Sequence, residues 1–376
     1  MISLKVAEAI AVAIPATFFP EVIYQVYKLN KTKQQKMVTK KNLLIIFFIF
    51  STLIGFAQKP LVWIYTDMSD GTLKGPTHMG TVNDPDDISA MAGYLLMCNE
   101  FKTLGIVVAS THRKEHVSTP HQGEWANNFF GKAYADDLPG LNKNIGGYPE
   151  KIKFTQSCIK ESAERFSMEK NYTDLSKYST VKALFDVAKK QKDTINVLCW
   201  GSLTEPAILV KHCIETGETE ILKKLRFIAH WTNSSWHQGS IEHPENVANC
   251  REDANACGYM KEQAFAGKIV YHELGAIGQH GIVSGCQIGS EYYNQYKSSA
   301  LGKIYAEGKF VYNGVDDSDG ATYWTLPGKW GVSLKDVPSN GTNSPEIEKA
   351  NEVKFFEQSK KIHDELLRRA KLAAGN

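Results

Sequence analysis

Short apolar runs alternate along this chain with segments in which apolar side chains recur at helical spacing. Leu61–Tyr65 and Leu104–Ala109 are continuous apolar runs, and each predicts a buried strand. In the segment 88–96 between them, apolar residues return every three or four positions. That spacing predicts an amphipathic helix packed against these strands.

The alternation continues through most of the chain. Further strands are predicted at Ile195–Trp200, Arg226–Trp231 and Lys268–His272, and further helices at Val181–Lys190, from Thr204 onward and at Glu346–Ala373. Ser179 or Thr180 is the expected N-cap of the first of these helices, and Pro206 suits the first turn of the second. Strands separated by helices are typical of βαβ units. We therefore expect an α/β fold, a doubly wound, mostly parallel open sheet with helices on both faces.

The first residues show a different pattern. Lys40 and Lys41 precede an uncharged, mostly apolar run from Leu43 to Phe56, and small residues lead up to Gln58. This is the pattern of a secretory signal, and the run is short for a membrane span. We expect residues 37–57 to be a cleaved signal peptide, with an uncleaved anchor or a buried helix as the alternative.

The position of this signal predicts the organisation of the rest. Residues 1–36 would be an upstream extension or follow from a misassigned start, with Met37 as the true one. Residues 58–376 would form a single domain that ends in the C-terminal helix. The mature chain would then be secreted or periplasmic, with no stable membrane partner after cleavage.

Composition and charge narrow the class of partner. The chain has 376 residues, of which 43% are apolar and 22% charged, as in ordinary globular proteins with a large core. The net charge of +2 gives no electrostatic reason to expect a nucleic-acid partner. A small neutral molecule is the expected partner, and a homo-oligomer is compatible with the sequence.

The cysteines do not form a metal-binding motif. The chain has seven, none of them in a CxxC pair, which argues against a zinc ribbon or a thioredoxin-type site. Cys250 and Cys257 are the only close pair. In an exported chain they could form a disulfide, and two buried thiols in a large core are the equal alternative.

Polar residues gather where the predicted strands end. These segments are Thr66-Asp67, Asn83–Asp87, Ser110-Thr111-His112, Gly201–Thr204 and Trp231-Thr232-Asn233. In an open parallel sheet, ligands bind at the carboxyl ends of the strands. Acidic groups directed into one crevice repel one another unless a cation lies between them, and hard oxygen ligands suit calcium.

Helix capping is the simpler explanation for part of this set. Asp is favoured at the N-cap and in the first turn, which would account for one or two of Asp84, Asp86 and Asp87. Capping does not account for Asp67 at the end of an apolar strand. We therefore expect Asp67 and Asp87 to share a site.

Several of these segments resemble a known family. Thr66-Asp67 followed by Asp86-Asp87-Ile88 resembles the N-terminal aspartate motif of the inosine-uridine nucleoside hydrolases. The segments Gly201–Ala207, Asn249–Ala256 and Asp319–Thr322 resemble later motifs of that family, in the same order. Tyr94–Leu96 and Asn99–Phe101 are more similar to secreted bacterial proteins with a nucleoside-hydrolase-like domain of unknown function.

The resemblance implies roles for individual residues. The family's activity would make this chain a calcium-dependent hydrolase of glycosyl bonds, acting on a nucleoside or a related glycoside through a metal-bound water. Asp67 would be the general base and a calcium ligand, with Asp87, Asp319 and the backbone carbonyl of Thr204 as further ligands. The substrate-binding residues would be Asp86, Ser110, Thr111, His112, Asn233, Glu245 and Asn249. His230, Trp231 and Trp236 are further candidates for contacts with the leaving group.

The sequence also departs from the family. An insertion follows Asp67 from Met68 to about Val82, and Tyr65 replaces the first Asp of the motif. Ser110 or Thr111 stands in place of a ribose-contacting Asn. Val247 stands in place of an acid, and Glu245 is the nearest candidate to replace that acid. These departures leave the metal ligands in place and alter the predicted sugar and base pockets.

Two alternatives belong to other classes. A non-catalytic calcium-dependent protein that binds glycans or nucleosides could use the same fold. Asp70-Gly71-Thr72-Leu73 is similar to a haloacid-dehalogenase motif, but Met68 occupies the position of its nucleophile, so covalent catalysis of that kind is excluded.

Overall fold

The computed structural model describes residues 58–75, 80–82, 85–108, 120–232 and 243–375. Residues 59–376 form one compact unit by their contacts. None of the helices within the described ranges is long and apolar enough to cross a membrane. The expected signal peptide at residues 37–57 and the upstream residues 1–36 lie outside the described residues.

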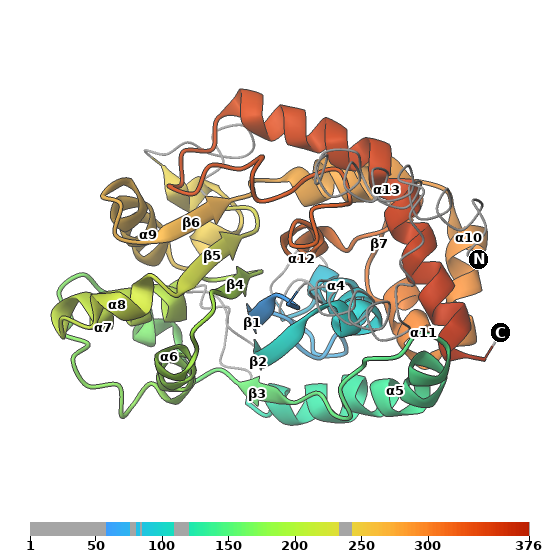
Figure 1. Ribbon diagram of the computed structural model, residues 1–376, viewed down its shortest axis with the longest axis horizontal. Helices are drawn as coiled ribbons and strands as arrows, with labels where there is room; N and C mark the ends of the chain where they lie inside the picture. The colour runs from blue at the N-terminus through green and yellow to red at the C-terminus, as the bar shows by residue number, and fades with distance from the viewer. Residues whose placement is uncertain (1–57, 76–79, 83–84, 109–119, 233–242, 376) are drawn as a thin grey trace, which may run out of the picture. The chain divides into compact units, whose positions relative to one another are not determined.

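A six-stranded parallel sheet lies at the centre of this unit (Figure 1). Its strands are β1 (Leu61–Tyr65), β2 (Lys102–Val108), β3 (Phe154–Gln156), β4 (Ile195–Cys199), β5 (Leu225–Ala229) and β6 (Val270–Glu273). Their order is β3-β2-β1-β4-β5-β6, and every neighbouring pair is parallel. The order reverses at β1, so the predicted doubly wound fold is confirmed.

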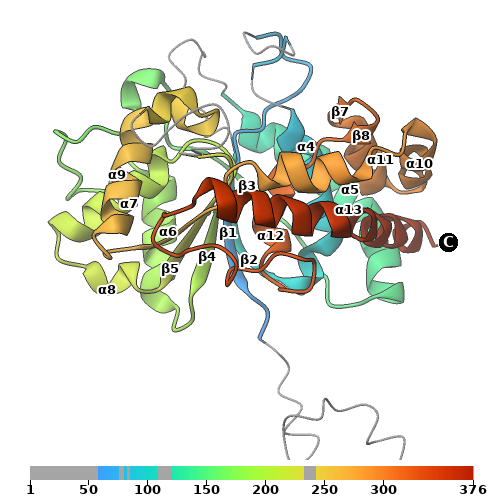
Figure 2. The same ribbon diagram turned by 90° about the horizontal axis from the view of Figure 1, so that it is seen from above.

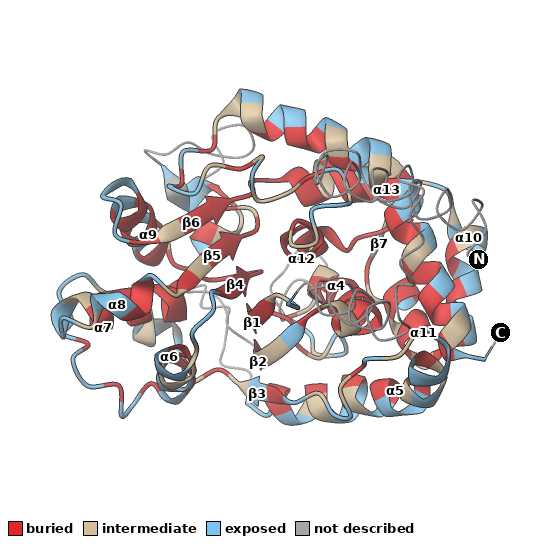
Figure 3. Cartoon of the chain, in the orientation of Figure 1, coloured by how far each residue is buried: buried red, intermediate tan, exposed pale blue. Residues whose placement is uncertain are grey.

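The central strands β1 and β4 are buried along their whole length because helices cover both faces of the sheet. All five residues of β1 are buried, and so are all five of β4 (Figure 3). Continuous apolar runs, without the alternation of a half-exposed strand, are what a parallel sheet between two helical layers requires. This is why five of the six strands could be located from the sequence, whereas β3 was not predicted.

Helices cover the two faces of the sheet in separate groups, as Figures 1 and 2 show. One group is α6 (Ser179–Lys190), α7 (Thr204–Glu215), α8 (Thr219–Leu222) and α9 (Ala254–Phe265). The other is α4 (Asp86–Met97), α5 (Gln122–Asn144), α10 (Ser290–Asn294), α11 (Ala300–Glu307), α12 (Ala321–Trp324) and α13 (Pro345–Ala373). Each group packs its own apolar core against the sheet. A short hairpin, β7 (Phe310–Val311) and β8 (Gly314–Val315), lies outside the main sheet.

The start of α6 differs from the prediction. Ser179 is the first helical residue, and the N-cap position belongs to Tyr178, whose side chain makes no capping bond. Thr180 is not the cap either. Its hydroxyl accepts a hydrogen bond from the Cys158 backbone N–H at 3.1 Å, so the threonine serves a loop contact.

A π-helix at Gly278–Val283 packs closely against the segment that carries Asp319. A Cβ atom at Gly278 would lie 2.0 Å from the Ser318 carbonyl oxygen. Only glycine permits that approach, because any side chain would overlap the neighbouring backbone. The short η8 helix (Ser318–Gly320) is thereby held at a fixed distance from the π-helix.

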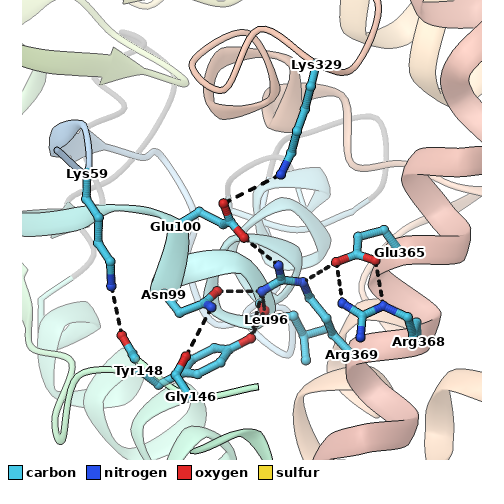
Figure 4. Close-up of polar contacts among 11 residues, drawn as sticks. Lys59, Leu96, Asn99, Glu100, Gly146, Tyr148, Lys329, Glu365, Arg368 and Arg369 are labelled. Atoms are coloured by element: carbon cyan, nitrogen blue, oxygen red, sulfur yellow. Dashed lines mark hydrogen bonds and ion pairs between the residues drawn. The ribbon is translucent and has the colours of Figure 1, made fainter. Parts of the chain in front are cut away.

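A buried arginine joins the end of α13 to the end of α4 (Figure 4). The Arg369 side chain is 3% exposed, and its guanidinium donates hydrogen bonds to acceptors on three sides. These acceptors are Leu96 O (3.1 Å), Asn99 Oδ1 (2.5 Å), Tyr148 Oη (2.9 Å), Glu100 Oε1 (2.8 Å) and Glu365 Oε1 (2.7 Å). We call this set of residues the Arg369 cluster.

Candidate active site

Carboxylates from separate parts of the chain meet at the carboxyl end of the sheet. One carboxylate oxygen from each of Asp86, Asp87 and Asp319 lies within 4.8 Å of the others. Asp67, two residues after β1, lies beside Asp87, whose charge raises the pKa of the Asp67 carboxyl. We call Asp67, Asp86, Asp87 and Asp319 the carboxylate cluster.

Asp86 and Asp87 lie in the first turn of α4, where acids are favoured, but neither is its N-cap. The N-cap of α4 is Pro85, which makes no side-chain capping bond. Asp87 is 1% exposed, and its carboxylate accepts a hydrogen bond from the Thr66 hydroxyl. The acids of α4 are therefore directed into the protein toward the end of β1. Asp84 lies outside the described residues.

Asp67 is held against the end of β4. Its side chain is 4% exposed, and a Cβ atom at Gly201 would lie 2.6 Å from its carboxyl carbon. Any other residue at position 201 would displace the carboxylate. The glycine that begins the predicted Gly201–Thr204 motif thus has a steric function beside Asp67.

The electrostatics of the cluster are those of like charges brought out of water. Burial raises the pKa of Asp67 well above its usual range, and the charges of Asp87 and Glu252 raise it further. Burial also raises the pKa of Asp87, with the charge of Asp319 as the next cause. A cation between these groups would favour their ionised forms.

The donor set fits a hard divalent cation. Carboxylate oxygens converge from α4 and η8. Such oxygens bind calcium or magnesium better than softer metals. The surrounding residues are buried, so a bound ion would be partly shielded from solvent. Within the described residues, this is the one group of His, Cys, Asp and Glu side chains with such geometry.

Glu252 is a member of this site that the sequence analysis missed. It is fully buried, and its charge raises the pKa of Asp67. Glu245, which we predicted instead, is exposed, and its carboxylate pairs with the His243 ring at 3.1 Å. Glu252, and not the predicted Glu245, is therefore the glutamate near Asp67. Its position directly before Asp253 in the recognised Asn249–Ala256 segment was the signal available in the sequence.

Asn249 and Thr204 hold the loops of the site together. The Asn249 amide donates to the carbonyl oxygens of Trp200 (2.7 Å) and His230 (2.9 Å), which joins the ends of β4 and β5. The Thr204 hydroxyl donates to Asp253 at 2.6 Å, and Asp253 also caps α9 by accepting from Ala256 N–H at 3.1 Å. Both amide hydrogens of Asn249 are used within the fold, so only its carbonyl oxygen is left for a substrate.

Lys309 is a second residue that the sequence analysis missed. Its side chain is 8% exposed, and its ammonium lies 3.3 Å from Asp86 and 3.1 Å from Asp316. Asp86, which we predicted to hold sugar hydroxyls, is thus already paired with a cation. The ion pair places one positive charge at the edge of the carboxylate cluster.

A row of aromatic rings approaches the cluster from the end of β5. His230 Nε2 lies 3.9 Å from Asp319, and the ring centroids of His230 and Trp231 are 5.9 Å apart. Trp231 has a φ of 47°, a left-handed conformation that costs a bulky residue about 1 kcal/mol. His280, on the π-helix, lies 6.2 Å from the Trp231 ring. Strained backbone and π-helices are both common at functional sites.

Several predicted substrate-binding residues lie outside the described residues. They are Ser110, Thr111, His112 and Asn233, and the further candidate Trp236. Their assignment stays a prediction.

Cys250 and Cys257 form a disulfide. Of the two alternatives, the structure supports the disulfide over the free thiols. The bridge joins the η4 helix (Asn249–Arg251) to α9 and encloses Glu252 and Asp253.

The sequence and the fold match known proteins. The family described as "Cellulose-binding Sde182, nucleoside hydrolase-like domain" matches residues 77–328. Among solved structures, a nucleoside hydrolase-related hypothetical protein from Saccharophagus degradans, described as associated with carbohydrate metabolism, has a TM-score of 0.56 at 15% identity. The match covers 84% of this chain and 72% of that one.

A second structure is less similar. A purine-preferring ribonucleoside hydrolase from Gardnerella vaginalis has a TM-score of 0.48 at 14% identity, covering 84% of this chain and 100% of that one. No curated protein matches the sequence. At these identities, the Saccharophagus structure supports the fold alone.

Proposed function

Because this chain belongs to the family of cellulose-binding Sde182 nucleoside-hydrolase-like domains, we propose that it hydrolyses glycosyl bonds at the carboxylate cluster. The observation that carries this proposal is the convergence of buried aspartates at the carboxyl end of the sheet. The Lys309–Asp86 ion pair does not account for the burial of Asp67 and Asp87 beside one another. Such groups are typical of sites that bind a cation or move a proton.

We propose calcium as the cation, held by Asp67, Asp87, Asp319 and the backbone carbonyl of Thr204. When bound, it would supply positive charge that offsets the carboxylates and would make a nearby water more acidic. The assignment is supported by the all-oxygen character of the carboxylate cluster.

Asp67 is the residue we propose as the general base. It would accept the proton of a water that attacks the anomeric carbon of the substrate. Burial makes this carboxylate a stronger base than one in water, and Gly201 fixes its position. The other acids would stabilise the positive charge that develops on the sugar ring in the transition state.

The substrate would be a small nucleoside or glycoside that differs from the common ribonucleosides. Two features of the described site support this. Lys309 pairs with Asp86, and the Asn249 amide hydrogens are bonded to the backbone, so two groups expected to bind a ribose are already engaged. A missing hydrogen bond to a sugar hydroxyl can change selectivity by several orders of magnitude.

A panel of nucleosides and synthetic glycosides, assayed with and without calcium, tests the function. We expect calcium-dependent turnover of some member, and weak or absent hydrolysis of inosine and uridine. An efficiency on inosine or uridine of roughly 10⁴ M⁻¹s⁻¹ or more, ordinary for a dedicated enzyme, would contradict the expected specificity.

The second candidate is a binding protein without turnover. The description of the family as cellulose-binding favours it. It predicts that the calcium-loaded protein binds saccharides and hydrolyses none of the panel. Turnover that is lost in Asp67→Asn would exclude it.

We also propose that the mature chain functions outside the cytoplasm. The Cys250–Cys257 disulfide supports this, because disulfides persist mainly in oxidising compartments. Sequencing the N-terminus of the exported protein is the test, with Gln58 expected as the first residue.

A further inference from the structure

A pocket of about 660 Å³ lies beside the carboxylate cluster, between α5, α11 and the loop that follows β1. Figure 1 shows α5 and α11 together on one side of the sheet. Pro85 and Ile88, on either side of the first two acids of α4, line part of its wall. The lining includes neither Asp67 nor Asp319. This is a separate site that adjoins the first.

Stacked aromatic rings from α5 form one wall. The Trp125 and Phe129 rings are nearly parallel, with centroids 5.4 Å apart and planes inclined by 15°. Phe129 is 40% exposed, so part of this aromatic surface is accessible to a ligand. A pair of parallel rings with an exposed face suits the C–H face of a pyranose ring.

A buried phenylalanine fixes this wall against the sheet. Phe130 is fully buried and packs edge-on against both rings, with centroids 5.9 Å from Trp125 and 5.0 Å from Phe129. Phe130 in turn contacts Phe154 of β3 at 5.5 Å. The aromatic pair is therefore fixed relative to the sheet before any ligand arrives, which reduces the entropy lost on binding.

The opposite wall is fixed by a buried carboxylate. Asp137 of α5 accepts hydrogen bonds from the backbone N–H groups of Ala300 (2.9 Å) and Leu301 (2.8 Å), at the start of α11. Burial of Asp137 raises its pKa, and these N–H groups oppose that rise. The width of the pocket is thus set by contacts within the protein.

Charged groups of both signs surround the aromatic wall. Lys132 and Asp136 come from α5, and Lys303 comes from α11. Among the described residues, the side chains of these three form no hydrogen bond or ion pair. The lining also includes Asp70 and Glu307, so the acids and the lysines nearly balance. No strong potential selects an anionic or a cationic ligand, whereas hydroxyl groups can both donate to carboxylates and accept from ammonium groups.

We infer that this pocket binds a neutral oligosaccharide, with a sugar ring stacked on Phe129 and its hydroxyls bonded to Lys132, Asp136 and Lys303. An apolar aromatic wall with a few uncommitted polar groups is the general composition of a small-molecule site. The inference concerns binding alone and does not depend on turnover at the carboxylate cluster. The site would hold a glycan chain close to that cluster through the first turn of α4.

Titration calorimetry of the mature protein with cello-oligosaccharides, with and without calcium, tests the inference. We expect binding in both conditions, weakened about tenfold by Phe129→Ala, which loses the stacking surface. The matched control is Phe356→Ala on α13, an exposed phenylalanine outside the pocket, which should bind as the wild type does. Lys132→Ala combined with Asp136→Ala should also weaken binding, and both side chains are exposed.

The outcomes separate this inference from the proposed function. Asp67→Asn should lose turnover and keep oligosaccharide binding. The pocket assignment fails if wild-type protein binds no neutral oligosaccharide, or if Phe129→Ala binds it unchanged. It also fails if inosine competes with the oligosaccharide and Phe129→Ala weakens inosine binding, because the pocket would then be a nucleobase site.

Discussion

The two ends of α4 carry buried charge in opposite ways. At its start, Asp86 and Asp87 face Asp67 and Asp319, and burial together with like charge raises the pKa of Asp67 and Asp87. At its end, Arg369 is equally buried, and its guanidinium is surrounded by carbonyl, amide, hydroxyl and carboxylate acceptors. At the start of α4, the Lys309–Asp86 ion pair leaves the pKa of Asp67 and Asp87 raised, whereas at its end the guanidinium of Arg369 is surrounded by acceptors.

This difference separates function from stability along a single helix. A buried charge with complete hydrogen bonding contributes to holding the fold, and removing it leaves its partners unsatisfied. A buried group of like charges destabilises the fold unless a ligand binds, so its presence indicates a task other than folding. Mutations at the two ends should therefore have opposite effects on activity and stability.

The largest effect is expected at the base. Asp67→Asn should lower turnover on the best substrate of the panel by roughly 10³-fold or more, because the amide cannot accept the proton. The same variant should be no less stable than wild type without calcium, since one charge of the cluster is removed. Asp174→Asn, at an exposed aspartate outside the carboxylate cluster and outside the lining of the pocket, is the control for turnover. Wild-type turnover of Asp67→Asn would transfer the role of the base to Asp86 or Asp84.

At the other end of the helix, Arg369→Met should lower the free energy of unfolding by about 3–5 kcal/mol, because it leaves buried acceptors without a donor. Urea denaturation measures this change. The neighbouring Arg368, whose side chain is 51% exposed, pairs with Glu365 at the surface. Arg368→Met should cost about 1 kcal/mol or less. Equal losses for the two variants would contradict the role given to the Arg369 cluster.

Calcium should distinguish the two clusters without any mutation. At a free concentration about a hundredfold above Kd, it should stabilise the wild type by about 2.7 kcal/mol, and chelation should reverse the shift and abolish activity. The shift should persist in Arg369→Met and disappear in Asp87→Asn and Asp319→Asn. Scanning calorimetry with EDTA-treated protein measures it. Full activity after exhaustive chelation would remove the metal from the mechanism.

A smaller effect comes from a buried histidine of β6, which makes the free energy of unfolding depend on pH. Burial lowers the pKa of His272 from 6.5 to about 4, and its ring bonds to the Val337 carbonyl at 3.0 Å. Because the unfolded chain binds the proton more tightly, this residue favours folding at neutral pH and loses that contribution as the pH falls below about 6.5. Wild type should therefore lose about 2 kcal/mol relative to His272→Gln between pH 7.5 and pH 5. Parallel pH profiles for the two proteins would contradict the shift.

The sequence was sufficient for the elements with a strong apolar pattern. β1 and β4 are buried on both faces, and the apolar side chains of α4 recur at helical spacing, so local sequence reflects their surroundings. The long helix α5 was not predicted, because Gly131, Pro139 and Gly140 interrupt it and its mean composition is polar. Its buried positions 126, 130, 133, 134, 137 and 141 do follow helical spacing, and this was the signal that could have located it.

Lys309 and Arg369 were missed because each contacts residues far away along the chain, whereas Glu252 lies within a recognised segment. Lys309 contacts Asp86 across 223 positions, and Arg369 contacts Asn99 across 270. No local pattern encodes such pairs, because either residue alone has the appearance of a surface charge. The structure explains two residues of the Asn99–Phe101 segment, which resembles secreted bacterial proteins. Asn99 and Glu100 are acceptors for Arg369.

The Cys250–Cys257 bridge has a consequence for how the protein is produced. Its ring is short, with a sequence separation of seven, so closing it removes little chain entropy and contributes about 2.5 kcal/mol at most to global stability. Protein made in a reducing cytosol would consequently fold to the same overall structure, with normal circular dichroism and an almost normal melting temperature. Glu252 and Asp253, which the bridge encloses, would nevertheless lose a constraint beside Asp67. A preparation judged only by its folding could thus be inactive for want of oxidation, and a thiol titration would reveal it.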